Sequence, residues 1–167
     1  MKKFLSRLAL ALLPIALYCA WFAAFEPNNY FGLRKSGASV VGDGIISRVQ
    51  EYRRAPANAL ILGDSRIARL DTKAIDFSTG RTYANLAYDG AQIVENIDLF
   101  YWLYARNPKI DTVVFSLSFY NLNAARAVEN RTETVTRQLT NPVAYLSNLD
   151  VNYKTLSAFG HAITGAA

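Results

Sequence analysis

A serine follows a short apolar run in the stretch Asn58–Arg66, and its position suggests chemistry. The run itself is Ala59 to Leu62, and Gly63-Asp64-Ser65 ends it abruptly. Runs of this length that end at a turn residue are typical of buried parallel strands. Residues just after such a strand lie at the carboxyl edge of an α/β sheet, where ligands bind. A serine there can act as a nucleophile, while nearby backbone N–H groups hold negative charge.

Two interpretations of Ser65 follow from this stretch alone. Arg66 to Leu70 can begin a helix, so Ser65 could be a nucleophile or could simply cap that helix. We expect the neighbouring Asp64 to be a structural hydrogen-bonding residue of the turn rather than a catalytic acid. The residues in the other loops at the same sheet edge indicate which of these two roles Ser65 has.

The elements that position Ser65 read as strand, helix, strand, helix, strand. Residues 82–87 and 111–117 predict a second and a third strand, and the helix between them should span Ala91 to Arg106. This order predicts a three-layer α/β/α fold with a parallel sheet and right-handed crossovers. With the flavodoxin-like order 2-1-3, the three loops at 63–65, 88–90 and 119–123 meet at one edge.

The helix predicted at 91–106 carries an apolar stripe with helical periodicity. We expect this stripe to be buried against the sheet, because a helix in an α/β layer buries its apolar face. An aspartate within the stripe should then destabilise the fold. The stripe consists of Ile93, Ile97, Phe100, Tyr101 and Tyr104.

The Gly-Asp-Ser motif, in this context, resembles the first block of the SGNH (GDSL-type) hydrolases. Gly90 falls where that family has its second-block glycine, and the loop after Val113–Leu117 falls where it has its third-block asparagine. The resemblance covers residues 57–125. It is nearest to membrane-anchored extracytoplasmic members that handle envelope polymers, including the DltD-like and alginate-acetylation branches.

The resemblance implies a serine nucleophile and an oxyanion hole. Ser65 would attack, and its N–H, the Gly90 N–H and an asparagine amide would hold the oxyanion. That asparagine is Asn121, with Asn123 as the alternative, although this loop lacks the glycine and the aspartate of the usual third block. The family's base comes from a late Asp-x-x-His block, which the only histidine, His161, does not match because Ala158 stands three residues before it.

The missing block and the small number of strands lead us to expect a truncated domain. We expect an SGNH-like α/β domain at 57–167, incomplete at its carboxyl end. It should follow an anchor at 1–25 and a juxtamembrane linker and helix at 26–56, of which the helix is Ile45–Arg54.

The anchor rests on an uncharged run from Leu8 to Phe25. As a helix, its 18 residues would span about 27 Å, close to the hydrocarbon thickness of a bilayer. Lys2, Lys3 and Arg7 precede the run, which places the amino terminus in the cytoplasm and the remainder outside. A cleaved signal peptide is the alternative, but the candidate cleavage sites put a bulky aromatic residue at position −3.

Composition limits the partners that we expect. Four of the five net positive charges lie in residues 1–35, so the basic character belongs to the membrane segment rather than to a nucleic-acid face. We expect no cofactor and no metal, and the single cysteine, Cys19, excludes both an intrachain disulfide and a cysteine-based zinc site. The expected partners are the lipid bilayer, envelope polysaccharide and a membrane-bound acyl-transfer protein.

Two functions therefore stand at the end of the sequence analysis. The first is a membrane-anchored extracytoplasmic serine esterase or O-acyltransferase that acts on acylated envelope glycans through an acyl-serine. The second is a non-catalytic SGNH-like binding domain or an inactive truncated fragment, which the missing base favours.

Overall fold

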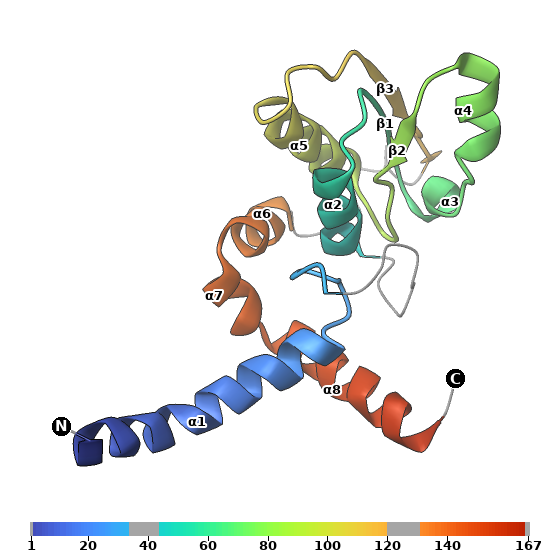
Figure 1. Ribbon diagram of the computed structural model, residues 1–167. Helices are drawn as coiled ribbons and strands as arrows, with labels where there is room; N and C mark the ends of the chain where they lie inside the picture. Colours follow the sequence, from blue (N-terminus) through green and yellow to red (C-terminus); the bar gives the residue numbers. More distant parts are fainter. Residues whose placement is uncertain (1, 34–43, 120–130, 166–167) are drawn as a thin grey trace. The chain divides into compact units, whose positions relative to one another are not determined.

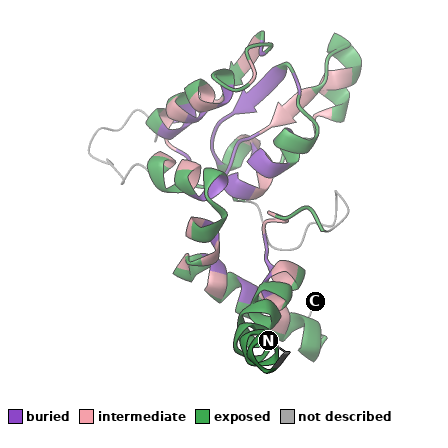
Figure 2. Cartoon of the chain, turned by 60° about the vertical axis from the view of Figure 1, so that its left-hand side comes forward, coloured by how far each residue is buried: buried purple, intermediate pink, exposed green. Residues whose placement is uncertain are grey.

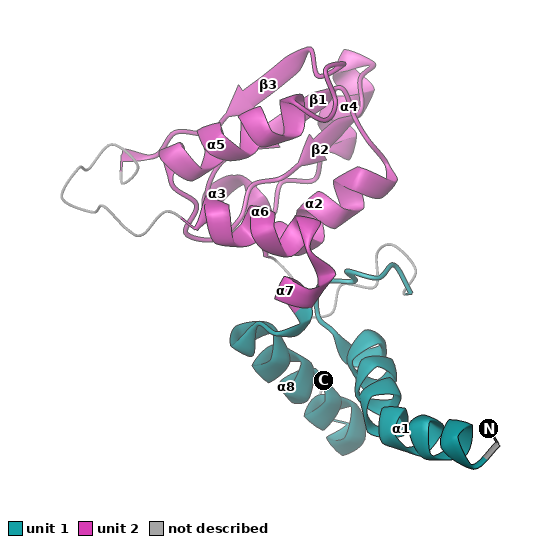
Figure 3. Ribbon diagram, turned by 90° about the vertical axis from the view of Figure 1, so that its left-hand side faces the viewer, with its two compact units in different colours: residues 1–41, 146–167 teal, residues 42–145 magenta. Residues whose placement is uncertain are grey.

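A computed structural model describes residues 2–33, 44–119 and 131–165. The chain forms two compact units, which we describe separately (Figure 3). One unit comprises residues 42–145 and contains the sheet. The other combines residues 1–41 with residues 146–167, so the last helix groups with the amino-terminal helix.

The sheet has three parallel strands in the order β2-β1-β3, as the sequence predicts. They are β1 (Ala59–Leu62), β2 (Tyr83–Asn85) and β3 (Thr112–Phe115). Ala59 stands opposite both Tyr83 and Thr112, so the carboxyl ends of all three strands lie at one edge. Every residue of β1 is buried, as expected for the central strand, whereas Val114 and Phe115 of the edge strand β3 are exposed (Figure 2).

Helices cover both faces of this sheet. Figure 1 shows α2 and α5 on one side and α3 and α4 on the other. The crossover from β1 to β2 and the crossover from β2 to β3 run in opposite directions across the sheet, so right-handed connections put α3 and α4 on one face and α5 on the other. The helices of this unit are α2 (Ile45–Arg54), α3 (Ser65–Ala68), α4 (Lys73–Thr79), α5 (Ile93–Tyr104) and α6 (Thr132–Thr140), followed by α7 (Pro142–Leu146) at its end.

The face that α5 buries differs from our prediction, although the helix itself is confirmed. Ile97 is 40% exposed, whereas Leu99 is only 2% exposed and Leu103 is buried in the same way. Glu95 and Asn96 complete the buried side. The predicted stripe of Ile93, Ile97, Phe100, Tyr101 and Tyr104 is therefore wrong as the core face, since three of its five members are exposed and none is buried.

The reason is that α5 carries apolar residues on more than half of its circumference. The apolar periodicity is then compatible with two different buried faces. Which face is buried depends on the residues at the amino-terminal turn of the helix. Here Glu95 is buried at that turn, and Leu99 and Leu103, which follow it at four-residue intervals, lie on the same buried side.

The other unit contains α1 (Lys2–Phe25) and α8 (Leu149–Thr164). Residues Lys3–Phe25 of α1 are long and apolar enough to span a membrane. The two helices touch through aromatic residues. The Phe159 ring lies edge-on to Trp21 and to Phe25, with distances between ring centroids of 6.0 Å and 4.9 Å respectively. The sequence pattern predicted no helix at Leu149–Thr164, so α8 is an element that it did not reveal.

Candidate active site

Ser65 is the first residue of α3, directly after the turn that ends β1. Asp64 holds an extended conformation and its Oδ1 accepts a hydrogen bond from the Arg66 N–H at 3.1 Å. Asp64 is therefore the cap of this helix, which confirms its predicted structural role. The Ser65 side chain is exposed at the carboxyl edge of the central strand, and it makes no hydrogen bond to any described residue. The capping interpretation of Ser65 thus loses its basis.

Gly63 brings the first loop and the third loop into contact. A Cβ atom at position 63 would lie 2.7 Å from Ser116 Cβ and 2.8 Å from Ile67 Cγ2. Real Cβ atoms do not approach side chains this closely, so only glycine fits here. The Ser116 N–H also donates to the Leu62 carbonyl at 2.8 Å, which continues the β1–β3 pairing into the loop.

The second loop joins the same edge through its backbone. The Tyr88 N–H donates to the Gly63 carbonyl at 3.2 Å, and the Leu86 N–H donates to the Ile61 carbonyl at 2.8 Å. Two residues later Gly90 has a φ of +71°, a left-handed conformation that other residues rarely adopt. The carboxyl ends of the three strands therefore meet at one edge, as predicted, whereas the convergence of Ser65, Gly90 and the loop at 119–123 stays a prediction.

Polar side chains hold the carboxyl-terminal end of the short helix α3. Asn85 Nδ2 donates to the Ile67 carbonyl at 2.8 Å, and Arg48 Nη2 donates to the Ala68 carbonyl at 2.8 Å. The same guanidinium reaches the Asn85 carbonyl at 3.1 Å through Nη1. These bonds satisfy the last carbonyls of α3 and tie the helix to the end of β2. Ser65 therefore stands on a helix held at both ends.

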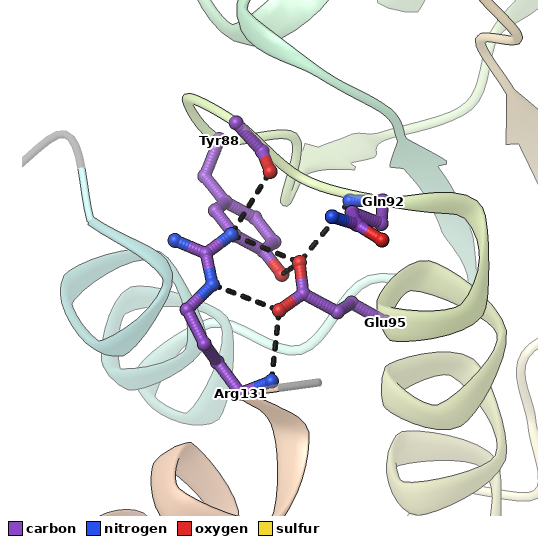
Figure 4. Close-up of polar contacts among 5 residues, drawn as sticks. Tyr88, Gln92, Glu95 and Arg131 are labelled. Atoms are coloured by element: carbon purple, nitrogen blue, oxygen red, sulfur yellow. Dashed lines mark hydrogen bonds and ion pairs between the residues drawn. The ribbon is translucent and has the colours of Figure 1, made fainter. Parts of the chain in front are cut away.

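An ion pair between the half-exposed Arg131 and the buried Glu95 holds the loop of Gly90 (Figure 4). Arg131 donates to both carboxylate oxygens of Glu95, from Nε at 2.8 Å and from Nη2 at 2.9 Å, and its backbone N–H donates at 2.9 Å. Nη2 also donates to the Gly90 carbonyl at 2.9 Å. The Tyr88 hydroxyl and the Gln92 N–H add further bonds to Glu95, both at 3.1 Å.

The electrostatics of this cluster favour a charged pair beside a neutral phenol. Burial acts to raise the pKa of Glu95, but the hydrogen bonds from Arg131 and Gln92 outweigh it, so that pKa lies below its usual range. Burial, and then the Glu95 charge, raise the pKa of Tyr88 well above its usual value. The Glu95 carboxylate raises the pKa of Arg131 in turn.

Sequence reasoning missed this cluster, although half of it carries a local signal. Gln92 and Glu95 form a capping box at the start of α5, a spacing that is recognisable before an apolar run. Arg131 has no such signal, because it reaches the cluster from the amino-terminal end of α6, across a long sequence separation.

The remaining predicted site residues divide between two places. Asn121 and Asn123 lie outside the described residues. His161 is exposed on α8, which belongs to the unit without the sheet. Within the described ranges 2–33, 44–119 and 131–165, no group of three or more histidine, cysteine or acidic side chains could hold a metal ion.

Comparisons with known proteins return no match. No protein-family model matches the chain, and no curated protein or solved structure matches it either. The resemblance to SGNH hydrolases therefore rests on the motif residues and on the sheet edge at which they lie.

Proposed function

We propose that this chain is the nucleophile-bearing part of a membrane-anchored serine esterase or O-acyltransferase. Ser65 Oγ attacks the carbonyl carbon of an acyl ester, the ester C–O bond breaks, and the released alcohol takes up the serine proton. Water then completes a hydrolysis, or a sugar hydroxyl completes an acyl transfer. The substrate class is acylated envelope glycan.

One observation carries this proposal: an exposed serine follows the central strand of a parallel sheet in the order β2-β1-β3. The order of strands reverses at this point, and such switch points are where open α/β sheets bind ligands. Asp64 caps the helix, so the serine hydroxyl is left for another task. The Tyr88 N–H bonds to the Gly63 carbonyl and so links the loop that carries Gly90 to the turn before Ser65. This link supports the proposed role of the Gly90 N–H as an oxyanion donor.

A non-catalytic binding domain is the second candidate, and one observation favours it. A serine nucleophile needs a base, and residues 42–145 contain no histidine. The same edge would then bind a glycan without forming a covalent bond. This candidate includes an inactive fragment of a longer enzyme.

The anchor places either function at the membrane. We propose that α1 spans the cytoplasmic membrane once, with Lys2, Lys3 and Arg7 inside and the α/β unit outside. An extracytoplasmic site of this kind would meet envelope polysaccharide and a membrane-bound acyl donor protein.

Acylation of Ser65 in the presence of a soluble base tests the proposal. The detergent-solubilised chain is incubated with p-nitrophenyl acetate, with and without imidazole, and the acetylated residue is located by mass spectrometry. Imidazole should accelerate acetylation at position 65, because it supplies the missing base. Ser78, an exposed serine on α4, provides the matched control.

The two functions predict different outcomes for the Ser65→Ala and Ser78→Ala variants. The esterase proposal requires that Ser65→Ala alone abolishes the imidazole-dependent acetylation. Equal acetylation of both variants would exclude Ser65 as the nucleophile. If acetylated glycan still bound to the Ser65→Ala protein in that case, the binding domain would be the better description.

A further inference from the structure

The helix α8 touches α1 along one side only. The Tyr18 hydroxyl lies 2.6 Å from Asn152 Oδ1, and Phe159 packs against the aromatic rings of Trp21 and Phe25. All three contacts come from the last two turns of α1. On α8 these contacts extend from Asn152 to Phe159, and only its last turn, up to Thr164, lies beyond them.

A second side of α8 is apolar and exposed. Its residues are spaced by four, three and seven positions, which places them on one face of a helix. The exposed fractions are 86% for Leu149, 73% for Tyr153, 57% for Leu156 and 68% for Ile163. This face borders the α1 contact made by Asn152 and Phe159, and the buried residues Val151 and Thr155 lie on the opposite side of that contact.

A third side of α8 is polar, and its one aspartate and one lysine pair with each other. Lys154 Nζ and Asp150 Oδ2 form an ion pair at 2.7 Å between successive turns, and both side chains are exposed. Ser157 and His161 continue the same side toward the end of the helix. The helix therefore has one face for a protein neighbour, one for an apolar medium and one for water.

We propose that α8 lies in the lipid–water interface at the carboxyl-terminal end of α1, with its exposed apolar face inserted into the bilayer. This inference rests on α1 spanning the membrane and not on the chemistry of Ser65. Tyr18 and Trp21 are the residue types that mark the headgroup level of a membrane helix. Because α8 packs against these residues, the contact holds it at the depth where amphipathic helices bury their apolar side.

A phospholipid bilayer fits this face better than a charged partner does. Within the described part of α8, Asp150 and Lys154 are the only side chains of aspartate, glutamate, lysine or arginine, and they pair with each other. Helices that depend on anionic lipids carry a basic face instead. We therefore expect insertion into a neutral phosphatidylcholine bilayer, with little change when salt is added.

Spin labels on adjacent residues of α8 test the inference. The full chain, with Cys19 replaced by alanine, is placed in phosphatidylcholine nanodiscs, and a single label is attached at Leu156→Cys or at the matched control Ser157→Cys. Accessibility to oxygen, which concentrates in lipid, is compared with accessibility to a water-soluble nickel chelate. Tyr153→Cys and Lys154→Cys form a second pair, and a label at Leu12→Cys reports on α1 alone.

We expect the ratio of oxygen accessibility to nickel-chelate accessibility to be several-fold higher for labels at 156 and 153 than for labels at 157 and 154. Nickel access at 156 and 153 equal to that of their controls would place the face in water and overturn the inference. Exclusion of both reagents at 156 and 153 would mean that protein covers the face, which overturns it as well. A lipid-exposed label at Leu12 in either case would leave the anchor intact and reject only the placement of α8.

Discussion

The Arg131 guanidinium binds both carboxylate oxygens of Glu95, a side chain that is almost completely buried. This pair connects the amino-terminal ends of α6 and α5, and through Nη2 it also holds the Gly90 carbonyl. The loop of the predicted oxyanion donor is therefore positioned by a charge pair and not by apolar packing alone.

Removal of the Arg131 charge should destabilise the α/β unit. Arg131→Met leaves the Glu95 carboxylate buried without its main partner, and we expect a loss of about 1–3 kcal/mol in the free energy of unfolding, since Arg131 itself is half exposed. Denaturant titration of the full chain measures the loss. Arg81→Met is the control, because it breaks an exposed pair with Asp111 and should cost under about 1 kcal/mol. Equal losses for the two variants would contradict the importance of the Arg131–Glu95 pair.

Acid should weaken the protein through Glu95. Its pKa is lowered in the folded state, so its contribution to stability is complete above the unfolded pKa of about 4.3 and disappears as the pH falls through the folded value. The difference in unfolding free energy between the wild type and Glu95→Gln should therefore shrink below about pH 4. Titrations from pH 7 to pH 3 measure it, and a difference that stays constant over this range would contradict the assignment.

The two sides of α5 should respond differently to truncation. Leu99→Ala removes a buried side chain and should cost about 2–5 kcal/mol, whereas Ile97→Ala alters an exposed one and should cost under about 1 kcal/mol. Thermal unfolding of both variants measures the contrast. A larger loss for Ile97→Ala would restore the face that periodicity predicted.

The two site glycines should fail for different reasons when replaced by alanine. Gly63→Ala forces its Cβ into Ser116 and Ile67 and should cost several kcal/mol or displace the third loop. At Gly90 the nearest atom to a Cβ, Arg131 Nη2, is 4.0 Å away, so Gly90→Ala should cost only about 1–2 kcal/mol from the positive φ. The helical Gly160, whose Cβ would meet nothing within 4 Å, is the control and should tolerate alanine. A greater loss for Gly90→Ala would contradict this ranking.

Membrane topology follows from the charges that precede α1. Alkaline phosphatase fused after Ala167 should be active, because the chain beyond α1 is expected outside the cytoplasm, and the fusion should stay with membranes after high-salt washing. Replacement of Lys2, Lys3 and Arg7 by glutamine should reduce that activity. An active fusion released as a soluble, shortened protein would instead support a cleaved signal peptide.

The sequence predicted the elements best where one pattern has one interpretation. Ala59–Leu62 is a short apolar run before Gly63, and it forms the central strand as predicted. Helix Ile45–Arg54 has only one apolar side; the helix forms as predicted, and Ile45, Ile46 and Val49 on that side are buried. Helix α5 has two apolar sides, so composition could not decide which one faces the sheet.

The sequence predicted the parts of the candidate site that depend on local pattern. These parts are the serine, the strand that positions it and the glycine of the second loop. Arg131 reaches the site only through a tertiary contact with Glu95. No local pattern in the sequence predicts a contact between these two residues. The asparagines at 121 and 123 stay predictions, since they lie outside the described residues.

The central position of β1 also has a consequence for how the chain matures. Synthesis delivers β1 before either of its neighbours, and its second partner begins only at Thr112. Until that strand emerges, an uncharged Ala-Leu-Ile-Leu segment has an open side. Formation of the sheet must wait for this distant pairing, which makes it slow compared with helix formation. The growing chain therefore exposes an unpaired apolar strand until residues 112–115 have been made, and unpaired strands of this kind are prone to self-association.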